Sequence, residues 1–440
     1  MKSTMLLAAL ACLVCAGAAA AVGAAGAGPG DDGGPPSFEV WLLDQQGADA
    51  NGSAGRLHVF HGGRLVDDPS GAVPETVELG EAARTYCIEA TASEPRRPHM
   101  LVFNGGDEDG AGGNTHAVIA YVASGHIAFL DADTREPVGC VDAGAQAHAA
   151  WPTPDQRHLI VANQNGKLLQ RIATDYASDE YTLEGAATLD LAACTTPSGA
   201  PCESPGLRPD NAPICPRTTG DGAFTFVTLR GGGMFVIDHN VTPMRIVAEY
   251  DSAHVDDNGC GEMEAAGKMY VNSGAGAPAE PYGHSVYAFD LDAFGATPSA
   301  TPNSPAARLV YSRDGAVDAH AVALTRHARY LWWGDRRQND VTVVDTETDA
   351  IVNRFSLAGM ASVDPAPDLF DLSPSGHRMF ASLRGPRPAS GHEASGSTPG
   401  VGVIQVLRSG RQGRLVGVAG VQGIGGRAPD PHGIRVRDLR

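Results

Sequence analysis

Positive charge is scarce in this chain of 440 residues. It has 32 lysine and arginine residues against 51 aspartate and glutamate residues, which gives a formal net charge of -19 at pH 7. Nucleic-acid phosphates and anionic lipid surfaces both attract proteins through basic residues. We therefore expect no nucleic-acid partner and no attachment to an anionic membrane surface.

Long apolar runs are missing after the first two dozen residues. A helix needs about 20 mostly apolar residues to span a bilayer, and no later stretch reaches that length. The N-terminal stretch MKSTMLLAALACLVCAGAAAAVGAAGAG has an early lysine, an apolar run and then small residues, which is the pattern of an export signal. We predict a signal peptide over residues 1–26, a flexible linker over 27–37, and a periplasmic or secreted protein without a membrane span.

Several sequence motifs that indicate a particular catalytic or binding function are absent. The chain contains no C-x-x-C-H motif, G-x-S-x-G motif, H-E-x-x-H motif or phosphate-binding glycine loop. We therefore expect no covalent haem. The function has to be argued from residues that lie far apart in the sequence.

Cysteine is sparse, but its number after the signal is even. Six residues remain: Cys87, Cys140, Cys194, Cys202, Cys215 and Cys260. An even number in an exported chain predicts disulfides, although six cysteines allow 15 connectivities and the sequence selects none. Cys194 and Cys202, in the loop CTTPSGAPC, are the first candidate pair, and Cys87 with Cys140 is the second.

Glycine and proline are abundant, with 55 and 30 residues, and they separate many short apolar segments. One unit recurs: an apolar strand, a turn, a second apolar strand, and an alternating third strand that commonly ends in Asp. Seven third strands can be traced: GRLHVFHGG from Gly55, GHIAFLDAD from Gly125, GKLLQRIAT from Gly166, GGMFVIDHN from Gly232, GHSVYAFDL from Gly283, DVTVVDTET from Asp340 and GVGVIQVLR from Gly400. Their spacing of about 40 to 70 residues predicts an all-β, seven-bladed propeller over residues 38–440.

The two ends of the propeller region complete one another. FEVWLLDQ, GRLHVFHGG and ETVELG supply only three strands for the first blade, and DPHGIRVRD, from Asp430, remains after the seventh blade is complete. We predict that this C-terminal strand is the innermost strand of the first blade. Such closure leaves no open sheet edge.

The repeat resembles the YVTN-type β-propeller family. The segments DLSPSGHRMFASLRG, TPDQRHLIVANQNG and NDVTVVDTETDAIVNRF carry the resemblance, which covers nearly all of the mature chain. The wider group includes binding proteins, lactonases, and the propeller domains of nitrous oxide reductase and haem-d1 nitrite reductase. The resemblance implies the architecture and says little about function, because this fold hosts many unrelated activities.

Four histidines and one aspartate occupy equivalent places in the repeats. The residue five positions before the turns TPDQR, TRHAR and SPSGH is His148, His320 and Asp368 respectively. RPHMLVF and DPHGIRV place His99 and His432 in the same register, whereas the fourth and fifth blades offer Pro213 and either Gly259 or Cys260. Each position opens an innermost strand, so we expect these side chains to meet at the mouth of the central channel.

Imidazole nitrogen binds zinc, copper, iron or nickel, and rotationally related strands can bring distant ligands together. We therefore predict an exported binding protein with a transition-metal site, copper or zinc, formed by His99, His148, His320 and His432 with Asp368. His254, Cys260 and Glu262 are additional candidates because they lie near the entry to the fifth blade, and His284 and His392 lie on loops or strands near the same mouth. A histidine at this place in a repeat can also serve only as a hydrogen-bonding residue between blades.

Two other classes of function remain open. A metal with an open coordination position would make the protein a metal-dependent enzyme, either a lactonase-like hydrolase with Asp368, Asp318 or Glu262 as proton acceptor, or an oxidoreductase. A metal-free channel would indicate a scaffold for a protein partner. The acidic loop around Asp107, Glu108 and Asp109 lacks regular calcium-ligand spacing. We expect His58, His126 and His239, on outer strands or turns, to be solvated.

Overall fold

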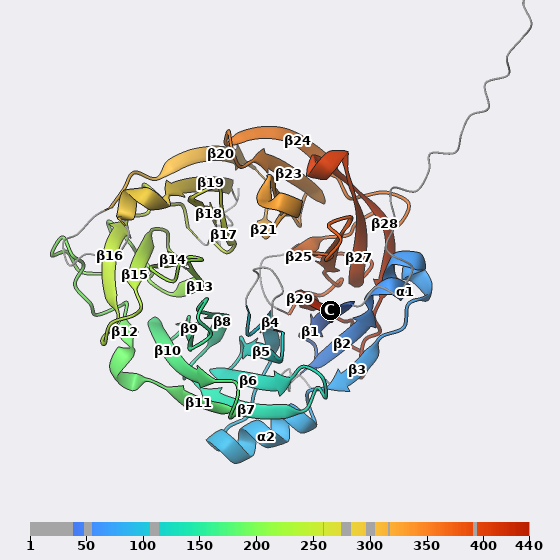
Figure 1. Cartoon of the computed structure of the whole chain (residues 1–440), viewed down its shortest axis with the longest axis horizontal. Coiled ribbons are helices and arrows are strands. Elements are labelled where there is room, and N and C mark those ends of the chain that lie inside the picture. The colour runs from blue at the N-terminus through green and yellow to red at the C-terminus, as the bar shows by residue number, and fades with distance from the viewer. Residues whose placement is uncertain are drawn as a thin grey trace, which may run out of the picture. The chain divides into compact units, whose positions relative to one another are not determined.

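The computed structural model describes residues 38–47, 55–105, 114–257, 259–273, 283–295, 304–315, 317–389 and 394–439. Within these ranges the strands form seven antiparallel sheets, arranged as blades of one ring (Figure 1). The predicted seven-bladed β-propeller is therefore confirmed. The predicted signal peptide and linker, the acidic loop at residues 107–109 and His392 lie outside the described residues.

Each blade has its innermost strand first. Blade 1 consists of β29 (Pro431–Asp438), β1 (Phe38–Asp44), β2 (Arg56–His61) and β3 (Glu75–Glu78), and blade 2 of β4 (Pro98–Phe103), β5 (His116–Tyr121), β6 (His126–Asp131) and β7 (Pro137–Asp142). Blade 3 consists of β8 (Ala147–Pro152), β9 (His158–Asn163), β10 (Leu168–Asp175) and β11 (Glu180–Leu183), with the short β12 (Leu189–Asp190) also paired to β10. Blade 4 consists of β13 (Pro213–Thr218), β14 (Thr225–Leu229), β15 (Met234–Asp238) and β16 (Arg245–Tyr250).

The remaining blades follow the same order. Blade 5 consists of β17 (Glu262–Ala265), β18 (Lys268–Ser273), β19 (Gly283–Asp290) and β20 (Arg308–Asp314), and blade 6 of β21 (Ala319–Leu324), β22 (Tyr330–Asp335), β23 (Asp340–Asp345) and β24 (Ala350–Ser356). Blade 7 consists of β25 (Pro367–Leu372), β26 (Arg378–Leu383), β27 (Gly400–Leu407) and β28 (Gln412–Gly420). All seven traced segments are third strands.

The ring closes as the sequence predicts. β29 pairs antiparallel with β1, and the paired residues run from Phe38 with Asp438 to Asp44 with Pro431. The C-terminal strand thus becomes the innermost strand of the blade that the N-terminal strands build. Backbone hydrogen bonds between β29 and β1 therefore hold the two ends of the chain together.

Apolar side chains fill the spaces between neighbouring blades. Trp41 of blade 1 contacts Phe103 of blade 2 in an edge-to-face arrangement, with ring centroids 5.2 Å apart, and both side chains are buried. Because a blade has neighbours on both sides, its third strand is covered as well. Our expectation of solvated His58, His126 and His239 was therefore wrong, since each ring is only 2% exposed and bonds to a hydroxyl group, for example His239 Nδ1 to Thr225 Oγ1 at 3.0 Å.

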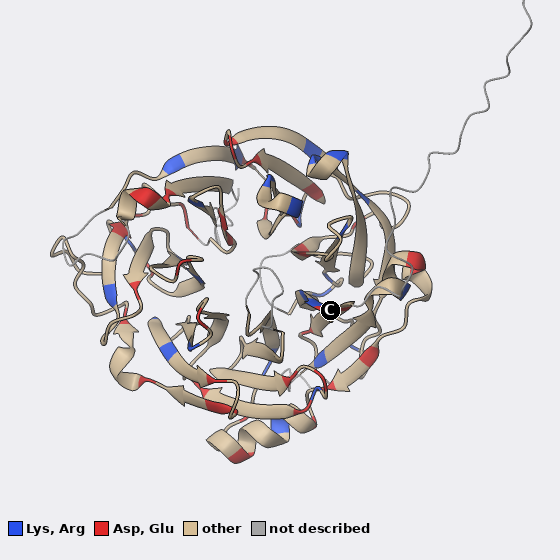
Figure 2. Cartoon of the chain, viewed as in Figure 1, with Lys and Arg blue, Asp and Glu red and all other residues tan. Residues whose placement is uncertain are grey.

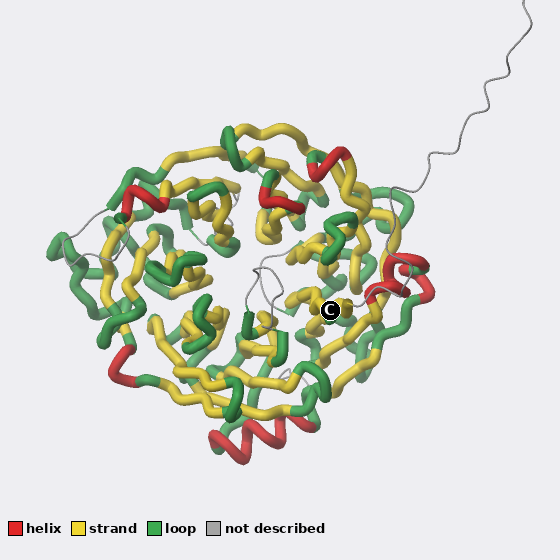
Figure 3. The backbone as a smooth tube through the Cα atoms, viewed as in Figure 1, coloured by secondary structure: helices red, strands yellow, loops and turns green. Residues whose placement is uncertain are grey.

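The helices are short, and the two α-helices lie at the outer side of the ring (Figure 3). The α-helices are α1 (Gly62–Asp67) and α2 (Ala82–Thr91), and the 3-10 turns are Pro69–Gly71, Gly185–Ala187, Leu291–Phe294, Arg326–Ala328 and Arg408–Gly410. Among the described residues, no helix has the length and apolar character needed to cross a bilayer. Figure 2 shows acidic and basic positions interspersed around the ring.

Three disulfides join the six cysteines that lie within the described residues. The two predicted pairs, Cys87–Cys140 and Cys194–Cys202, are both formed, and the first fastens α2 to β7 at the outside of the ring. The third disulfide joins Cys215 of blade 4 to Cys260, which lies two residues before the first strand of blade 5. Cys260 is therefore not available as a thiolate ligand in this structure, which corrects its place among the additional metal candidates.

Candidate metal centre

The four histidines and the aspartate that share one place in the repeats lie where the pairing of the innermost strands is irregular. We call them the register residues. In β4, β8 and β21 the pairing with the second strand shifts between the residues on either side of His99, His148 and His320 respectively. The same kind of shift includes His432 in β29 and Asp368 in β25. A β-bulge turns a side chain out of its normal alternation, so this repeated irregularity explains why residues of five blades gather at one place.

The structure completes the register in blades 4 and 5. Ile214 and not Pro213 takes the place in blade 4, because the shift in β13 falls between Pro213 and Pro216. In blade 5 the equivalent residue is Cys260. Glu262 pairs with the fourth residue of β18, and Val322 pairs with the fourth residue of β22. Cys260, two residues before Glu262, therefore corresponds to His320, two residues before Val322. We call the seven residues the register ring: His432, His99, His148, Ile214, Cys260, His320 and Asp368.

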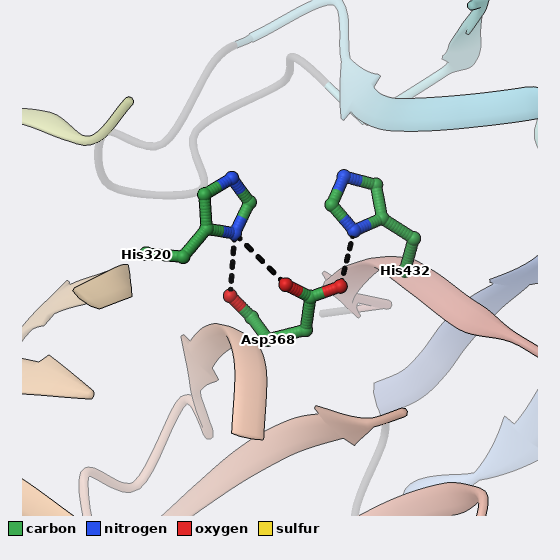
Figure 4. A group of neighbouring side chains, drawn as sticks. All are labelled: His320, Asp368 and His432. Atoms are coloured by element: carbon green, nitrogen blue, oxygen red, sulfur yellow. Dashed lines mark hydrogen bonds and ion pairs between the residues drawn. The ribbon is translucent and has the colours of Figure 1, made fainter. Parts of the chain in front are cut away.

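Three members of the register ring form a compact polar group. His320, Asp368 and His432 are all buried, and each offers a ligand atom such that these atoms lie within 4.8 Å of one another. The Nδ1 atom of His320 is 3.0 Å from Asp368 Oδ1, and Nδ1 of His432 contacts the other carboxylate oxygen (Figure 4). A group of this composition could hold a metal ion.

His99 and His148 extend this group. The ring of His99 stacks on that of His432 with centroids 3.7 Å apart, and its Nε2 atom lies 3.3 Å from Nε2 of His148. All four register histidines and Asp368 therefore form one continuous cluster. Among the described residues, the compact group of three does not include the additional candidates His254 and Glu262.

Every register histidine has an oxygen atom beside its Nδ1. The Nδ1 atom of His148 lies 2.8 Å from the carbonyl oxygen of Ile214, and that of His320 lies 2.9 Å from the carbonyl oxygen of Asp368, in both cases the register residue of the next blade. His99 Nδ1 lies 2.8 Å from Gln45 Oε1, and His432 Nδ1 contacts the Asp368 carboxylate. A carbonyl oxygen only accepts, so Nδ1 carries the proton and the lone pair of the neutral ring is on Nε2.

The Nε2 atoms therefore carry the lone pairs that could bind a metal ion. Figure 4 shows the second ring nitrogens of His320 and His432 pointing away from Asp368 on the same side. Nε2 of His432 is buried and has no hydrogen-bond partner among the described residues. Histidines that bind metals commonly donate their other ring N–H to a carboxylate or carbonyl oxygen, which fixes the orientation of the ring.

Asp368 is held as a carboxylate by two arginines. Its oxygens lie 2.5 Å from Arg336 Nη1 and 3.1 Å from Arg384 Nη1, and none of the three side chains is more than 3% exposed. Burial alone would raise the pKa of Asp368, but the contact with His432 and the positive charges of Arg384 and Arg336 hold that pKa well below its usual value. Asp368 therefore brings a negative charge to the cluster at neutral pH.

Burial keeps the imidazoles of His99, His148 and His432 neutral. It lowers the pKa of His148 to about 3 and that of His432 to about 4, and the neighbouring histidines add to the lowering of both. The pKa of His99 also falls well below its usual value, because the ring is buried and adjoins three other histidines. A neutral imidazole has the free lone pair that a metal ion needs.

The sequence reasoning missed the residues that hold these ligands. Gln45 follows β1 and donates from Nε2 to Asp430 Oδ2 at 3.1 Å, which orients its Oε1 atom toward His99. Arg384 binds the same Asp430 at 2.7 Å. A sequence signal existed, because a polar residue immediately follows the second strand in five blades: Gln45, Gln164, Arg230, Arg336 and Arg384.

The remaining candidates lie elsewhere. His254 is an exposed residue after β16 that bonds to Asp251, and His284 is buried in β19 against Tyr311 and Trp333. Glu262 begins β17 and accepts a hydrogen bond of 2.9 Å from Thr228, and burial raises its pKa to about 8. Glu262 lines a cavity of about 780 Å³ together with His320, Cys215 and Cys260.

No family model matches the chain, and no curated protein does. Solved structures do resemble it. The periplasmic gluconolactonase of Pseudomonas aeruginosa is 13% identical, with 92% of this chain and 100% of that chain covered and a TM-score of 0.56. A putative 6-phosphogluconolactonase from Bacteroides uniformis is 12% identical (91% and 99% covered, TM-score 0.57), and a hypothetical selenium-binding protein from Sulfolobus tokodaii is 11% identical (92% and 94%, TM-score 0.57). At identities this low, the structural similarity shows that the chain shares the propeller fold of lactonase-like structures and shows nothing finer. The YVTN-type resemblance stays a prediction.

Proposed function

We propose that the chain is an exported β-propeller protein that binds a transition-metal ion, copper or zinc, at the cluster of His99, His148, His320, His432 and Asp368. One observation carries this proposal. Each of the four imidazoles has its Nδ1 atom beside an oxygen, which leaves Nε2 as the ligand atom on all of them. Zinc and copper both accept neutral imidazole nitrogen.

The spacing of one pair supports a cation at this place. Two nitrogens bound to one tetrahedral zinc at about 2.0–2.1 Å lie roughly 3.3 to 3.4 Å from each other. The Nε2 atoms of His99 and His148 are 3.3 Å apart. A metal ion bound by both lone pairs would fit this separation.

The charge and the hydrogen bonds around the histidines suit a bound metal ion. The Asp368 carboxylate compensates part of the positive charge of a divalent ion, and it orients His320 and His432 through their Nδ1 atoms. The disulfides support export, because disulfides persist in oxidising compartments and are rare in the cytosol. Small-molecule or protein partners would act at this site or on the surface around it.

Metal content tests the proposal. Protein purified from its export compartment should contain copper or zinc, and the variants His148→Ala and His320→Ala should lose most of it. His377→Ala is the matched control, because His377 is exposed in a turn between β25 and β26. Equal metal content in the wild type and the three variants would contradict the proposed site.

A metal-dependent hydrolase is the second candidate, and the cavity beside His320 favours it. Glu262 lines this cavity, and a pKa of about 8 suits a carboxyl group that exchanges protons near neutral pH. Hydrolysis of a sugar lactone by the metal-loaded protein, lost in Glu262→Gln with metal content unchanged, would establish this activity. Metal binding without turnover favours the binding protein.

A further inference from the structure

Blades 4 and 5 contribute no histidine to the register ring. A disulfide lies where the histidines of the other blades would be. The register residue of blade 4 is Ile214, followed by Cys215, and that of blade 5 is Cys260. The Cys215–Cys260 disulfide joins the two blades at this level. The other two disulfides lie at the outside of blade 2 and within the loop that contains CTTPSGAPC.

Hydrogen bonds connect each end of this disulfide to a register histidine of the adjoining blade, His148 of blade 3 at one end and His320 of blade 6 at the other. On blade 4, the carbonyl oxygen of Ile214 accepts the hydrogen bond of 2.8 Å from His148 Nδ1. On blade 5, the side-chain amide of Asn272 donates to the carbonyl of Cys260 at 3.0 Å and to that of Ala319 at 2.9 Å. Ala319 immediately precedes His320, so the disulfide lies on a continuous path from His148 to His320.

The backbone around Cys260 is packed tightly on this path. A Cβ atom on Gly259 would lie 2.2 Å from the carbonyl oxygen of Asn272. Gly261 has a φ of +121°, and a Cβ atom there would lie 3.3 Å from the carbonyl oxygen of His320. Cys260 is thus fixed between glycines that touch blades 5 and 6, and movement of Cys260 displaces both contacts.

A small reagent can reach the disulfide. Cys215 and Cys260 are 4% and 7% exposed, and both line the cavity of about 780 Å³ that His320 also lines. The same cavity is bounded by Arg326 and His327, which are exposed residues of the turn between β21 and β22. The cavity therefore extends from exposed residues of this turn to both cysteines.

We propose that the Cys215–Cys260 disulfide positions His148 and His320, so that the oxidation state of this pair regulates the metal affinity of the register ring. This inference rests on the proposed metal site. A dithiol reduces the pair by thiol–disulfide exchange: the S–S bond breaks, two thiols form, and the dithiol supplies two electrons and two protons as it becomes a disulfide. Ile214 and Cys260 then lose their mutual tether, and the affinity falls.

The test compares metal affinities by competition with a chromophoric zinc chelator. The samples are the oxidised wild type, the wild type reduced with dithiothreitol and freed of reagent without oxygen, and the variants C215A/C260A and C194A/C202A in both states. We expect reduction to weaken zinc binding by roughly 10- to 100-fold, the cost of losing an outer partner of a metal ligand. C215A/C260A should bind weakly in both states, and C194A/C202A should behave as the wild type.

Two further measurements keep the test decisive if C215A/C260A does not fold. Asn272→Ala removes the amide between Cys260 and Ala319 without touching sulfur, and it should weaken zinc binding by a similar factor. The ¹⁵N shifts of the His148 ring, which report its tautomer, should change on reduction in the wild type. Equal or tighter binding after reduction overturns the inference, whereas absence of zinc binding in the oxidised wild type overturns the proposed function itself.

Discussion

The Nε2 atoms of His99 and His148 lie 3.3 Å apart, although the Nδ1 atom of each ring faces an oxygen acceptor. Neither ring has a second proton at neutral pH, because burial lowers the pKa of both. The two Nε2 atoms therefore lie beside each other in the register ring. The proposed metal ion would accept both lone pairs.

Gln45 should control the metal affinity through His99. Gln45→Leu removes the oxygen that faces His99 Nδ1 and leaves the size of the side chain nearly unchanged. We expect zinc binding to weaken roughly 10- to 100-fold, measured by chelator competition. Gln405→Leu is the control, because Gln405 lies on β27 and bonds only to the exposed Arg414 among the contacts described. Equal losses in both variants would contradict a specific role for Gln45.

Arg384 should be essential for stability. Its side chain is fully buried and binds both Asp368 and Asp430. Arg384→Leu leaves Asp430 without its ion-pair partner and Asp368 with Arg336 as its remaining arginine. Breaking a buried ion pair in this way costs about 3 to 5 kcal/mol. We expect a loss of that size in urea unfolding of the metal-free protein, and a far smaller one for Arg414→Leu.

His284 should make stability depend on pH. Burial lowers its pKa to about 3 in the folded chain, against about 6.5 in the unfolded chain. The unfolded state therefore binds more protons between these values, so this contribution is complete above pH 6.5 and falls by about 1.4 kcal/mol per pH unit on acidification. His284→Phe should reduce the difference in unfolding free energy between pH 7 and pH 5, whereas His377→Phe should not.

Deletion of residues 430–440 should open the ring. These residues include β29, which closes blade 1 by pairing with β1, and His432 of the metal cluster. We expect the truncated chain to be unfolded or aggregated, because the edge of β1 and the apolar side of blade 1 become exposed. A cooperative thermal transition at the temperature of the full chain would show that closure is dispensable.

The sequence predicted the architecture because its evidence is local. Period-two alternation, the turn residues and the unpaired segment after Asp430 are all visible within short windows, and they determined seven blades and the closure. The register of His99, His148, His320, His432 and Asp368 followed from the repeat. The structure brings these residues into one cluster, whereas their role in metal binding stays a proposal.

The rest of the site depends on contacts between blades, which no single repeat reveals. The repeat alignment predicts Pro213 instead of Ile214, because a bulge shifts the strand by a residue. The sequence does not reveal that Cys260 forms a disulfide with Cys215, because the two residues lie 45 positions apart. Gln45 and Asp430 are separated by 385 residues and meet only after the ring closes.

Anomalous X-ray scattering from crystals of the metal-loaded protein, recorded on both sides of the zinc and copper absorption edges, would locate the ion. We predict an anomalous peak inside the register ring, within bonding distance of imidazole Nε2 atoms, with His320 and His432 still held by Asp368 through Nδ1. A peak at another place, or none in fully loaded protein, would contradict this prediction.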